Sequence, residues 1–390
     1  MNLVLEELIL DKNIQVILSM AVSLAITWRA IPVIRNICHM RGLMENPVKR
    51  SSHVSPTPTF GGVGIFAGTL IGYMLWNFQD EEFLLHRVMA GLVVLFFLGL
   101  KDDLYALAPL KKIASQILAS VLVVVGSDLR ITSFFGIFGI HEIPYLAGVI
   151  VTVFIFVALI NAFNLIDGVD GLAGGIGMIS SAGFGLWYLL EGYWSLACLS
   201  LSLSASLLGF LRYNFSKTSK IFMGDTGSLI VGYLVTILAV KFIQLNESYN
   251  FSPDEHYVSA PVLTIVILSV PIFDTLRVFG LRILKGRSPF TADRLHLHHL
   301  LVDNGLSHVA TSLSLYGMTI GLTIFTYYLR TFFDNTALSL YVISVFAIYL
   351  GGCSWLEVRR FKRHKEKKTQ EQARSKSTKS LGLEGTISPN

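Results

Sequence analysis

Apolar residues recur along the chain in runs that are separated by short polar segments. About 20 mainly apolar residues are enough for a helix to cross the hydrocarbon core of a bilayer. The pattern predicts about eleven such helices: 14–34, 60–77, 88–100, 113–126, 145–163, 172–190, 195–212, 228–245, 258–276, 309–329 and 338–357. We therefore expect an all-α polytopic membrane protein, with residues 1–358 as its integral membrane domain.

The composition agrees with this prediction. Hydrophobic residues make up 53% of the 390-residue chain, charged residues 15%, and the mean hydropathy is +0.60. Ordinary soluble domains contain about 25% charged residues. Charged residues precede the first apolar run and no small-residue cleavage site follows it, which indicates a retained span rather than a signal peptide. The cysteines are far apart and lack the spacing of a disulfide framework or zinc site: Cys38, Cys198 and Cys353.

Lys and Arg residues are unevenly distributed among the connecting segments. If the N-terminus is outside, the inside segments are 35–59, 101–112, 164–171, 213–227, 277–308 and the tail from 358. These segments hold 24 of the 31 Lys and Arg residues, whereas the outside segments hold 4. Because cytoplasmic loops are enriched in Lys and Arg, the predicted topology has its N-terminus outside and its C-terminus in the cytoplasm.

Two segments outside the predicted helices have a distinct character. Between residues 129 and 143, apolar residues alternate with polar residues or glycine, which favours a short extracytoplasmic β-hairpin. The segment 359–390 is basic and then rich in Ser, Thr, Lys and Gln, which predicts a disordered cytoplasmic tail that meets anionic lipid headgroups. This tail carries most of the net charge of +5, so the pI of about 9.0 does not indicate nucleic-acid binding.

Acidic, carboxamide and histidine residues gather on the predicted inside. They occur in four segments: LGLKDDLYAL with Asp102 and Asp103, NAFNLIDGVDGLAGG from Asn161, KIFMGDTGS with Asp225, and TADRLHLHHLL with the histidines. Polar groups at a lipid boundary are costly and are usually retained because they line a site. Four segments on one side predict a site that faces the cytoplasm.

Three of these carboxylates are candidates for a catalytic or metal-binding role. Asp102 and Asp103 are adjacent, and their repulsion raises the pKa of one unless a cation compensates. Such a pair suits a general base or the surroundings of a metal, and a solvated helix end is the alternative. Asp225 lies in a glycine-flanked turn, where it either holds Mg²⁺ together with phosphate oxygens or simply begins a helix.

The histidine run lacks the spacing of a zinc site, because His296 and His298 point to different faces of a helix and HExxH is absent. Four basic residues lie close by: Arg282, Lys285, Arg287 and Arg294. A clamp for an anion or a sugar phosphate fits this composition. The alternative is an ordinary basic inside loop.

In this order and on one side of the membrane, the motifs KDD, NAFNLIDGVDGLAGG, KIFMGDTGS and DRLHLHH resemble those of the polyprenyl-phosphate N-acetylhexosamine-1-phosphate transferases. The resemblance runs from about residue 40 to residue 305. This family transfers a sugar 1-phosphate from a UDP-sugar to a membrane polyprenyl phosphate, usually undecaprenyl phosphate in bacteria, and releases UMP. The resemblance implies a multi-pass enzyme of the bacterial inner membrane that uses Mg²⁺, with Mn²⁺ as a substitute. It leaves the choice between monomer and homodimer open.

The resemblance also assigns roles to residues near the metal. Asp225 resembles the principal magnesium ligand, and Asn164 and Asp167 match positions close to the metal and the diphosphate. Asp102 and Asp103 resemble the acidic pair that activates the lipid phosphate or shapes the metal site, and the motif does not tell which is the base.

Further positions match substrate contacts of the family. Lys112 resembles a phosphate contact, and the candidates for the nucleotide pocket are Asp170, Asn214 and Phe222. The motif that contacts the sugar and the diphosphate corresponds to Arg294, His296, His298 and His299. Among these we expect His298 to take part in catalysis.

The donor sugar follows from the last motif. HLHH after SPFTADR resembles the N-acetylglucosamine branch, which begins O-antigen, enterobacterial common antigen or teichoic-acid linkage synthesis. We therefore expect transfer of GlcNAc 1-phosphate as the first membrane step of a cell-envelope polysaccharide. KRSSHVSPTPTFGG is similar to members that use other UDP-N-acetylhexosamines, and such a donor is the alternative.

Other classes of membrane protein fit the sequence less well. An ion-coupled secondary transporter would favour charges deep within the spans, whereas these acids gather at the inner ends. An intramembrane aspartyl protease needs a second Asp at the depth of Asp225 in a neighbouring span. A CDP-alcohol phosphotransferase needs an Ala-Arg step after Asp-Gly, which neither Asp167-Gly168 nor Asp170-Gly171 provides.

Overall fold

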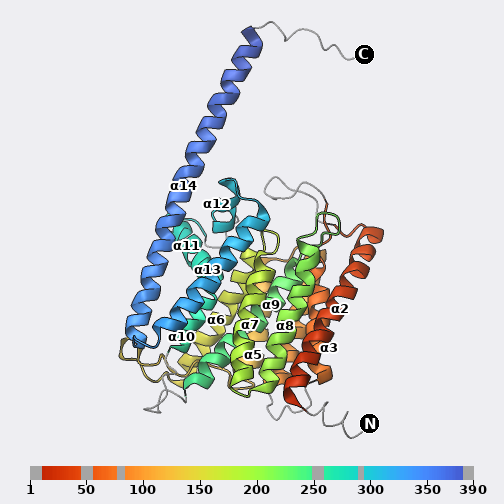
Figure 1. Cartoon of the computed structure of the whole chain (residues 1–390), viewed down its shortest axis with the longest axis vertical. Helices are drawn as coiled ribbons and strands as arrows, with labels where there is room; N and C mark the ends of the chain where they lie inside the picture. The colour runs from red at the N-terminus through yellow and green to blue at the C-terminus, as the bar shows by residue number, and fades with distance from the viewer. Residues whose placement is uncertain (1–10, 45–55, 77–83, 248–258, 289–293, 381–390) are drawn as a thin grey trace.

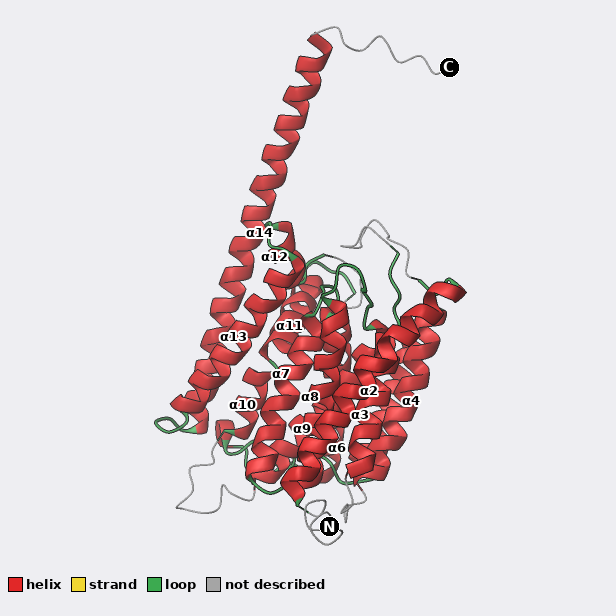
Figure 2. Ribbon diagram, turned by 45° about the vertical axis from the view of Figure 1, so that its right-hand side comes forward, coloured by secondary structure: helices red, strands yellow, loops and turns green. Residues whose placement is uncertain are grey.

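A computed structural model of the chain describes residues 11–44, 56–76, 84–247, 259–288 and 294–380. These residues form a bundle of helices, and Figure 2 shows no strand among them. The helices in chain order are α2 (Lys12–Arg41), α3 (Gly61–Trp76), α4 (Leu84–Leu104), α5 (Pro109–Val124), α6 (Tyr145–Ile166), α7 (Leu172–Leu190), α8 (Trp194–Asn214), α9 (Gly224–Glu247), α10 (Ala260–Ile267), α11 (Ser269–Leu284), α12 (Leu297–Asp303), α13 (His308–Leu329) and α14 (Asn335–Ser380).

Each of the eleven predicted spans coincides with one helix, or in one case with a pair of helices. Seven of the described helices are long and apolar enough to cross a membrane, or eight if the bent pair α10 and α11 forms one span. This confirms a polytopic helical membrane protein. The total of eleven spans and the orientation in the membrane stay predictions.

The ninth predicted span differs from a straight helix. The sequence predicts one helix over 258–276, but the structure breaks it at Leu268 and bends the two parts by 77°. Hydropathy reports only composition, so it does not reveal the bend. The break turns α11 away from the line of α10 and brings it to the part of the molecule that carries α12 and α14 (Figures 1 and 2).

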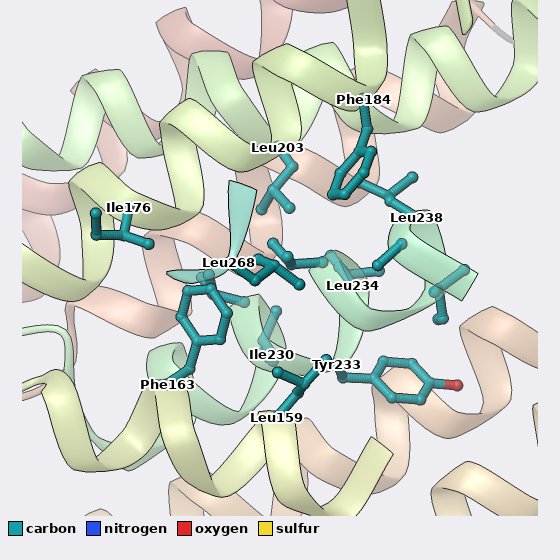
Figure 3. Close-up of a cluster of buried hydrophobic side chains, with 14 of the residues drawn as sticks. Leu159, Phe163, Ile176, Phe184, Leu203, Ile230, Tyr233, Leu234, Leu238 and Leu268 are labelled. Atoms are coloured by element: carbon teal, nitrogen blue, oxygen red, sulfur yellow. The ribbon is translucent and has the colours of Figure 1, made fainter. Parts of the chain in front are cut away.

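Helix α9 forms the centre of the bundle. Of its most apolar stretch, 83% is buried inside the protein. Figure 3 shows its side chains packed against those of α6, α7, α8 and the break between α10 and α11: Leu159, Phe163, Ile176, Phe184, Leu203, Ile230, Tyr233, Leu234, Leu238 and Leu268. Because α9 is packed on several sides, its first turn has a fixed position in the bundle.

Glycines allow α3 and α4 to approach the start of α9. A Cβ atom on Gly62 of α3 would lie 2.1 Å from the backbone nitrogen of Gly227, and one on Gly99 of α4 would lie 2.4 Å from Cα of Thr226. Only glycine tolerates backbone at this distance. The two glycines thus allow the start of α3 and the end of α4 to lie beside the first turn of α9.

Two predicted segments differ in the structure. Residues 129–143 contain the short 3₁₀ helix η1 (Ile137–Gly139) and a hydrogen bond from Ile143 N to Thr132 O of 2.8 Å, but no strand, so the predicted hairpin is a compact loop. The segment 359–380 continues α14, where the sequence predicts disorder, and in Figure 1 this helix projects well beyond the bundle. Residues 381–390 lie outside the described residues.

Candidate active site

The first turn of α9 is held by Asp103 at the end of α4. One carboxylate oxygen of Asp103 accepts a hydrogen bond from the backbone N–H of Asp225 at 2.7 Å. The other oxygen accepts from the backbone N–H of Thr226 at 3.0 Å and from its hydroxyl at 2.6 Å. Because the first N–H groups of a helix have no partner within the helix, Asp103 completes the hydrogen bonding of α9 from outside.

Lys112 at the start of α5 joins two carboxylates. Its ammonium forms ion pairs with Asp102 and with Asp225, the latter at 3.0 Å. The second oxygen of Asp225 accepts a hydrogen bond from Nδ2 of Asn164, whose Nδ2 also lies 2.9 Å from the Ser228 hydroxyl. We call Asp102, Asp103, Lys112, Asn164 and Asp225 the carboxylate cluster. Its residues lie where α4 and α6 end and where α5 and α9 begin.

The two acids of α4 lie beyond the apolar stretch 88–100 and have altered acidity. Burial raises the pKa of Asp102 to about 6, and the nearby carboxyl of Asp225 adds to the effect. Burial raises the pKa of Asp103 to about 7, against the hydrogen bonds from Thr226 and Asp225 that favour its carboxylate. Carboxyl groups with a pKa near neutrality are suited to proton transfer at physiological pH.

The loop between α6 and α7 is braced from several helices. Asp170 pairs with Lys220 at 2.6 Å and with His308 of α13 at 3.2 Å. Its backbone carbonyl accepts a hydrogen bond from Ser312 at 2.7 Å. Although burial opposes ionisation, the hydrogen bonds from His308 and Lys220 hold the pKa of Asp170 below its ordinary value. The loop therefore has a defined position next to the carboxylate cluster.

Asn214 and Phe222, both predicted to contact the nucleotide, lie beside this loop. The Asn214 side chain accepts from the backbone N–H of Gly171 and donates to Ile221 O at 2.7 Å. The ammonium of Lys220 lies 5.4 Å from the centre of the Phe222 ring. Asn214 is 5% exposed, so the structure shows it as a brace of the loop. Asp167 ends α6 at the same loop.

The histidines form a stack at the start of α12. The rings of His296 and His298 are parallel to within 14° with their centres 5.6 Å apart, and those of His298 and His299 are 4.3 Å apart. We call these three residues the histidine cluster. His298 is 2% exposed, and neither of its ring nitrogens has a hydrogen-bond partner among the described residues. Burial lowers the pKa of His298 to about 3 and that of His299 to about 4, so both rings are neutral at pH 7.

Gly168 connects the two clusters. A Cβ atom on Gly168 would lie 2.6 Å from Nε2 of His298, so the histidine ring lies directly against the loop after α6. Asn164, which binds Asp225, is four residues earlier in the same segment. Arg294 pairs with Asp303 of α12 at 2.9 Å and thereby flanks the histidines.

The structure thus brings most of the predicted residues into two adjoining clusters. Other side chains that hold the histidine segment or the loop after α6 were not predicted: Asp274, Arg277, Lys220, His308 and Glu357. Asp274 could have been found, because an acid within a predicted span indicates a function. The others carry no signal in a single sequence.

Comparison of the sequence with those of known proteins finds glycosyl transferases. The model of glycosyl transferase family 4 matches residues 85–243. A probable undecaprenyl-phosphate N-acetylglucosaminyl 1-phosphate transferase of Bacillus subtilis is 32% identical over 348 residues, which cover 87% of this chain and 91% of the relative.

Two enterobacterial relatives agree with this. The undecaprenyl-phosphate alpha-N-acetylglucosaminyl 1-phosphate transferases of Yersinia pestis and of Escherichia coli strain K12 are 31% and 30% identical, over 70% of this chain and 73% and 72% of their own lengths. The family model covers every residue of the carboxylate cluster, from Asp102 to Asp225. The chain is therefore a membrane enzyme that belongs to glycosyl transferase family 4, the family of these sugar 1-phosphate transferases.

Proposed function

We propose that the enzyme transfers GlcNAc 1-phosphate from UDP-GlcNAc to undecaprenyl phosphate. An oxygen of the lipid phosphate attacks the β-phosphorus of the donor, a new P–O bond forms, and the anhydride bond to the α-phosphate breaks to release UMP. Support comes from the activities for which the relatives are named, and the similarity to them covers most of the chain. The alternative donor is another UDP-N-acetylhexosamine.

The observation that carries this proposal is the carboxylate cluster. Two carboxylates and one ammonium converge where four helices end. Joining a phosphate to a diphosphate brings two anions together, so catalysis depends on position and on cations that neutralise the developing charge. Lys112 supplies one such cation, and Arg294 supplies another beside the histidines.

The donor atoms of the cluster fit Mg²⁺. Asp225 already contacts one cation, the ammonium of Lys112, and its other oxygen faces Asn164. Asn164 offers a further oxygen once its amide turns. Mg²⁺ commonly takes one or two carboxylates together with substrate phosphates and water, and bound there it would neutralise charge on the diphosphate.

The two acids of α4 have different surroundings, and we assign them different roles. Asp103 receives three hydrogen bonds from the start of α9, so it positions Asp225. Asp102 is held by Lys112 and by the N–H of Leu107 at 2.7 Å. Because Asp103 is engaged by these hydrogen bonds, Asp102, whose pKa burial raises to about 6, is the better group to accept a proton from the lipid phosphate.

In this proposal the site lies on the cytoplasmic face of the bacterial inner membrane. Nucleotide sugars are cytosolic, and the excess of Lys and Arg on the segments around the site favours the same side. The acceptor lies in the leaflet, from which its phosphate can reach the inner ends of α4 and α5.

Omission of one component at a time tests the proposal. Purified protein is given UDP-GlcNAc, undecaprenyl phosphate and Mg²⁺, and UMP is measured by chromatography. We expect UMP only in the complete mixture, with Mn²⁺ replacing Mg²⁺ in part. Absence of UMP from folded, monodisperse protein, or its release without the lipid, contradicts the proposed reaction.

A further inference from the structure

The segment that carries the histidine cluster is held by an acid that no motif includes. Asp274 lies on α11 and is 1% exposed. Its Oδ2 lies 2.8 Å from Nδ1 of His296, and its Oδ1 accepts from the backbone N–H of Leu297 at 2.8 Å. The hydroxyl of Tyr349 donates to the same Oδ1 at 3.2 Å. Three donors thus surround one buried carboxylate.

The contact with His296 determines the state of its ring. A carboxylate oxygen can only accept, so Nδ1 of His296 carries the proton. In the neutral ring Nε2 is then an acceptor, oriented by the bond that Nδ1 makes. The N–H of Leu297 is one of the first N–H groups of α12, so the same carboxylate also fixes the beginning of that helix.

One turn further along α11, Arg277 holds the preceding residue of the segment. Its guanidinium donates to the carbonyl of Leu295 at 2.7 Å and pairs with Glu357 of α14. Residues three apart on a helix face the same way, so Asp274 and Arg277 together hold residues 295–297. Figures 1 and 2 show α11, α12 and α14 next to one another.

A buried acid costs folding free energy unless its environment compensates for it, and in a membrane protein it indicates a function. The stacked rings lead from His296 to His298, which lies against Gly168 of the loop after α6. We propose that Asp274 is a positioning residue of the active site, which orients the ring of His296 and the start of α12 so that the histidine cluster faces that loop. Only the catalytic consequence of this inference rests on the proposed function.

Asp274→Asn tests the positioning role of Asp274 separately from its contribution to the fold. Asparagine keeps the shape and can still accept from Leu297, but its amide would donate to Nδ1 of His296 and reverse the tautomer. We expect kcat to fall about 10- to 100-fold, as when a group that orients a metal-binding histidine is lost. Asp128→Asn, an exposed acid paired with Arg130 at the other end of the bundle, is the matched control and should keep full activity.

A double-mutant cycle with His296→Gln provides the kinetic test. If Asp274 acts through His296, adding Asp274→Asn to His296→Gln changes kcat about twofold or less. Full multiplication of the two losses overturns the proposal, because it assigns Asp274 an effect independent of the histidine. Similar KM values in Asp274→Asn and the wild type are expected if the loss lies in orientation of the ring.

A spectroscopic measurement needs no activity. In protein labelled with ¹⁵N-histidine, the ring signals that disappear in His296→Gln belong to His296. We expect protonated Nδ1 in the wild type and unprotonated Nδ1 in Asp274→Asn. The same tautomer in both proteins overturns the proposal, even if the wild type releases no UMP and the proposed function itself fails.

Discussion

The two clusters of the active site are held in place in different ways. In the carboxylate cluster, the predicted site residues hold one another: Lys112 pairs with Asp102 and Asp225, and Asp103 binds the backbone of Asp225. In the histidine cluster, the motif residues are held by side chains outside the motifs, from α11 and α14. The carboxylate cluster therefore depends on the ends of central helices, whereas the histidine cluster depends on two peripheral ones.

This difference has a consequence for mutation. A change in the carboxylate cluster removes a group that contacts the reacting phosphates in the proposed mechanism. A change around the histidine cluster displaces the histidines but leaves their side chains chemically intact. We therefore expect the largest losses of activity at Asp225 and graded losses around the histidines.

Asp225→Asn should give the largest effect. The substitution keeps the hydrogen bond with Asn164 within reach but removes the charge that pairs with Lys112 and would bind Mg²⁺. We expect turnover to fall at least about 100-fold, as when a preorganised electrostatic partner is lost. UMP release measures the effect, and a monodisperse chromatographic profile reports the fold. Near-normal turnover would remove Asp225 from the metal site.

His298→Ala should lower turnover less than Asp225→Asn but clearly more than Lys368→Ala. The His298 ring is buried against the loop after α6, whereas residue 368 belongs to the projecting part of α14. We expect a loss of up to about 100-fold for the histidine variant, as when a group of an active site is misplaced, and no loss for the lysine variant. Equal effects of the two substitutions would contradict the assignment of the histidine segment to the site.

Gly168→Ala tests whether the two clusters work together. The added methyl group would meet Nε2 of His298 at 2.6 Å and must displace the ring or the loop. A shift of about 1 Å costs up to about 100-fold in rate, and we expect a loss near tenfold here. Gly183→Ala, where a methyl group meets no atom within 4 Å, serves as the control. Full activity of Gly168→Ala would show that the contact has no role in turnover.

Asp170→Asn should have the smallest effect on turnover and a measurable one on stability. The lowered pKa of Asp170 means that its ionised form contributes stability above the ordinary pKa of 3.8, and that this contribution is lost as the pH falls through the still lower folded-state value. We expect the variant to melt a few degrees lower at pH 7, as for a loss of about 1 kcal/mol. The difference should narrow toward pH 3. A difference that does not depend on pH would argue against the ion pairs with Lys220 and His308.

The helices were predictable because each apolar run must satisfy its backbone within the membrane, and a helix does this locally. The carboxylate cluster was predictable for a related reason. Its members end spans on one side, so a correct set of spans brings Asp102, Asn164 and Asp225 to one face of the bundle.

The contacts that support the histidine cluster were not predictable from the same pattern, although Asp274 itself is marked as an acid within a predicted span. Asp274 lies in a stretch that reads as a single span, and only the bend of 77° at Leu268 brings its helix to α12. The partners in α14 are distant in sequence, and nothing local marks Glu357 or Tyr349 as contacts of Arg277 and Asp274. Packing between helices decides these contacts, and hydropathy does not report it.

The mass of the lipid product tests the central claim most directly. Undecaprenyl phosphate and Mg²⁺ are offered with UDP-GlcNAc and, separately, with other UDP-sugars, and the extracted lipid is analysed by mass spectrometry. The proposed function predicts undecaprenyl diphosphate carrying one N-acetylhexosamine, formed fastest from UDP-GlcNAc and absent with Asp225→Asn. Unchanged undecaprenyl phosphate with every donor would contradict it.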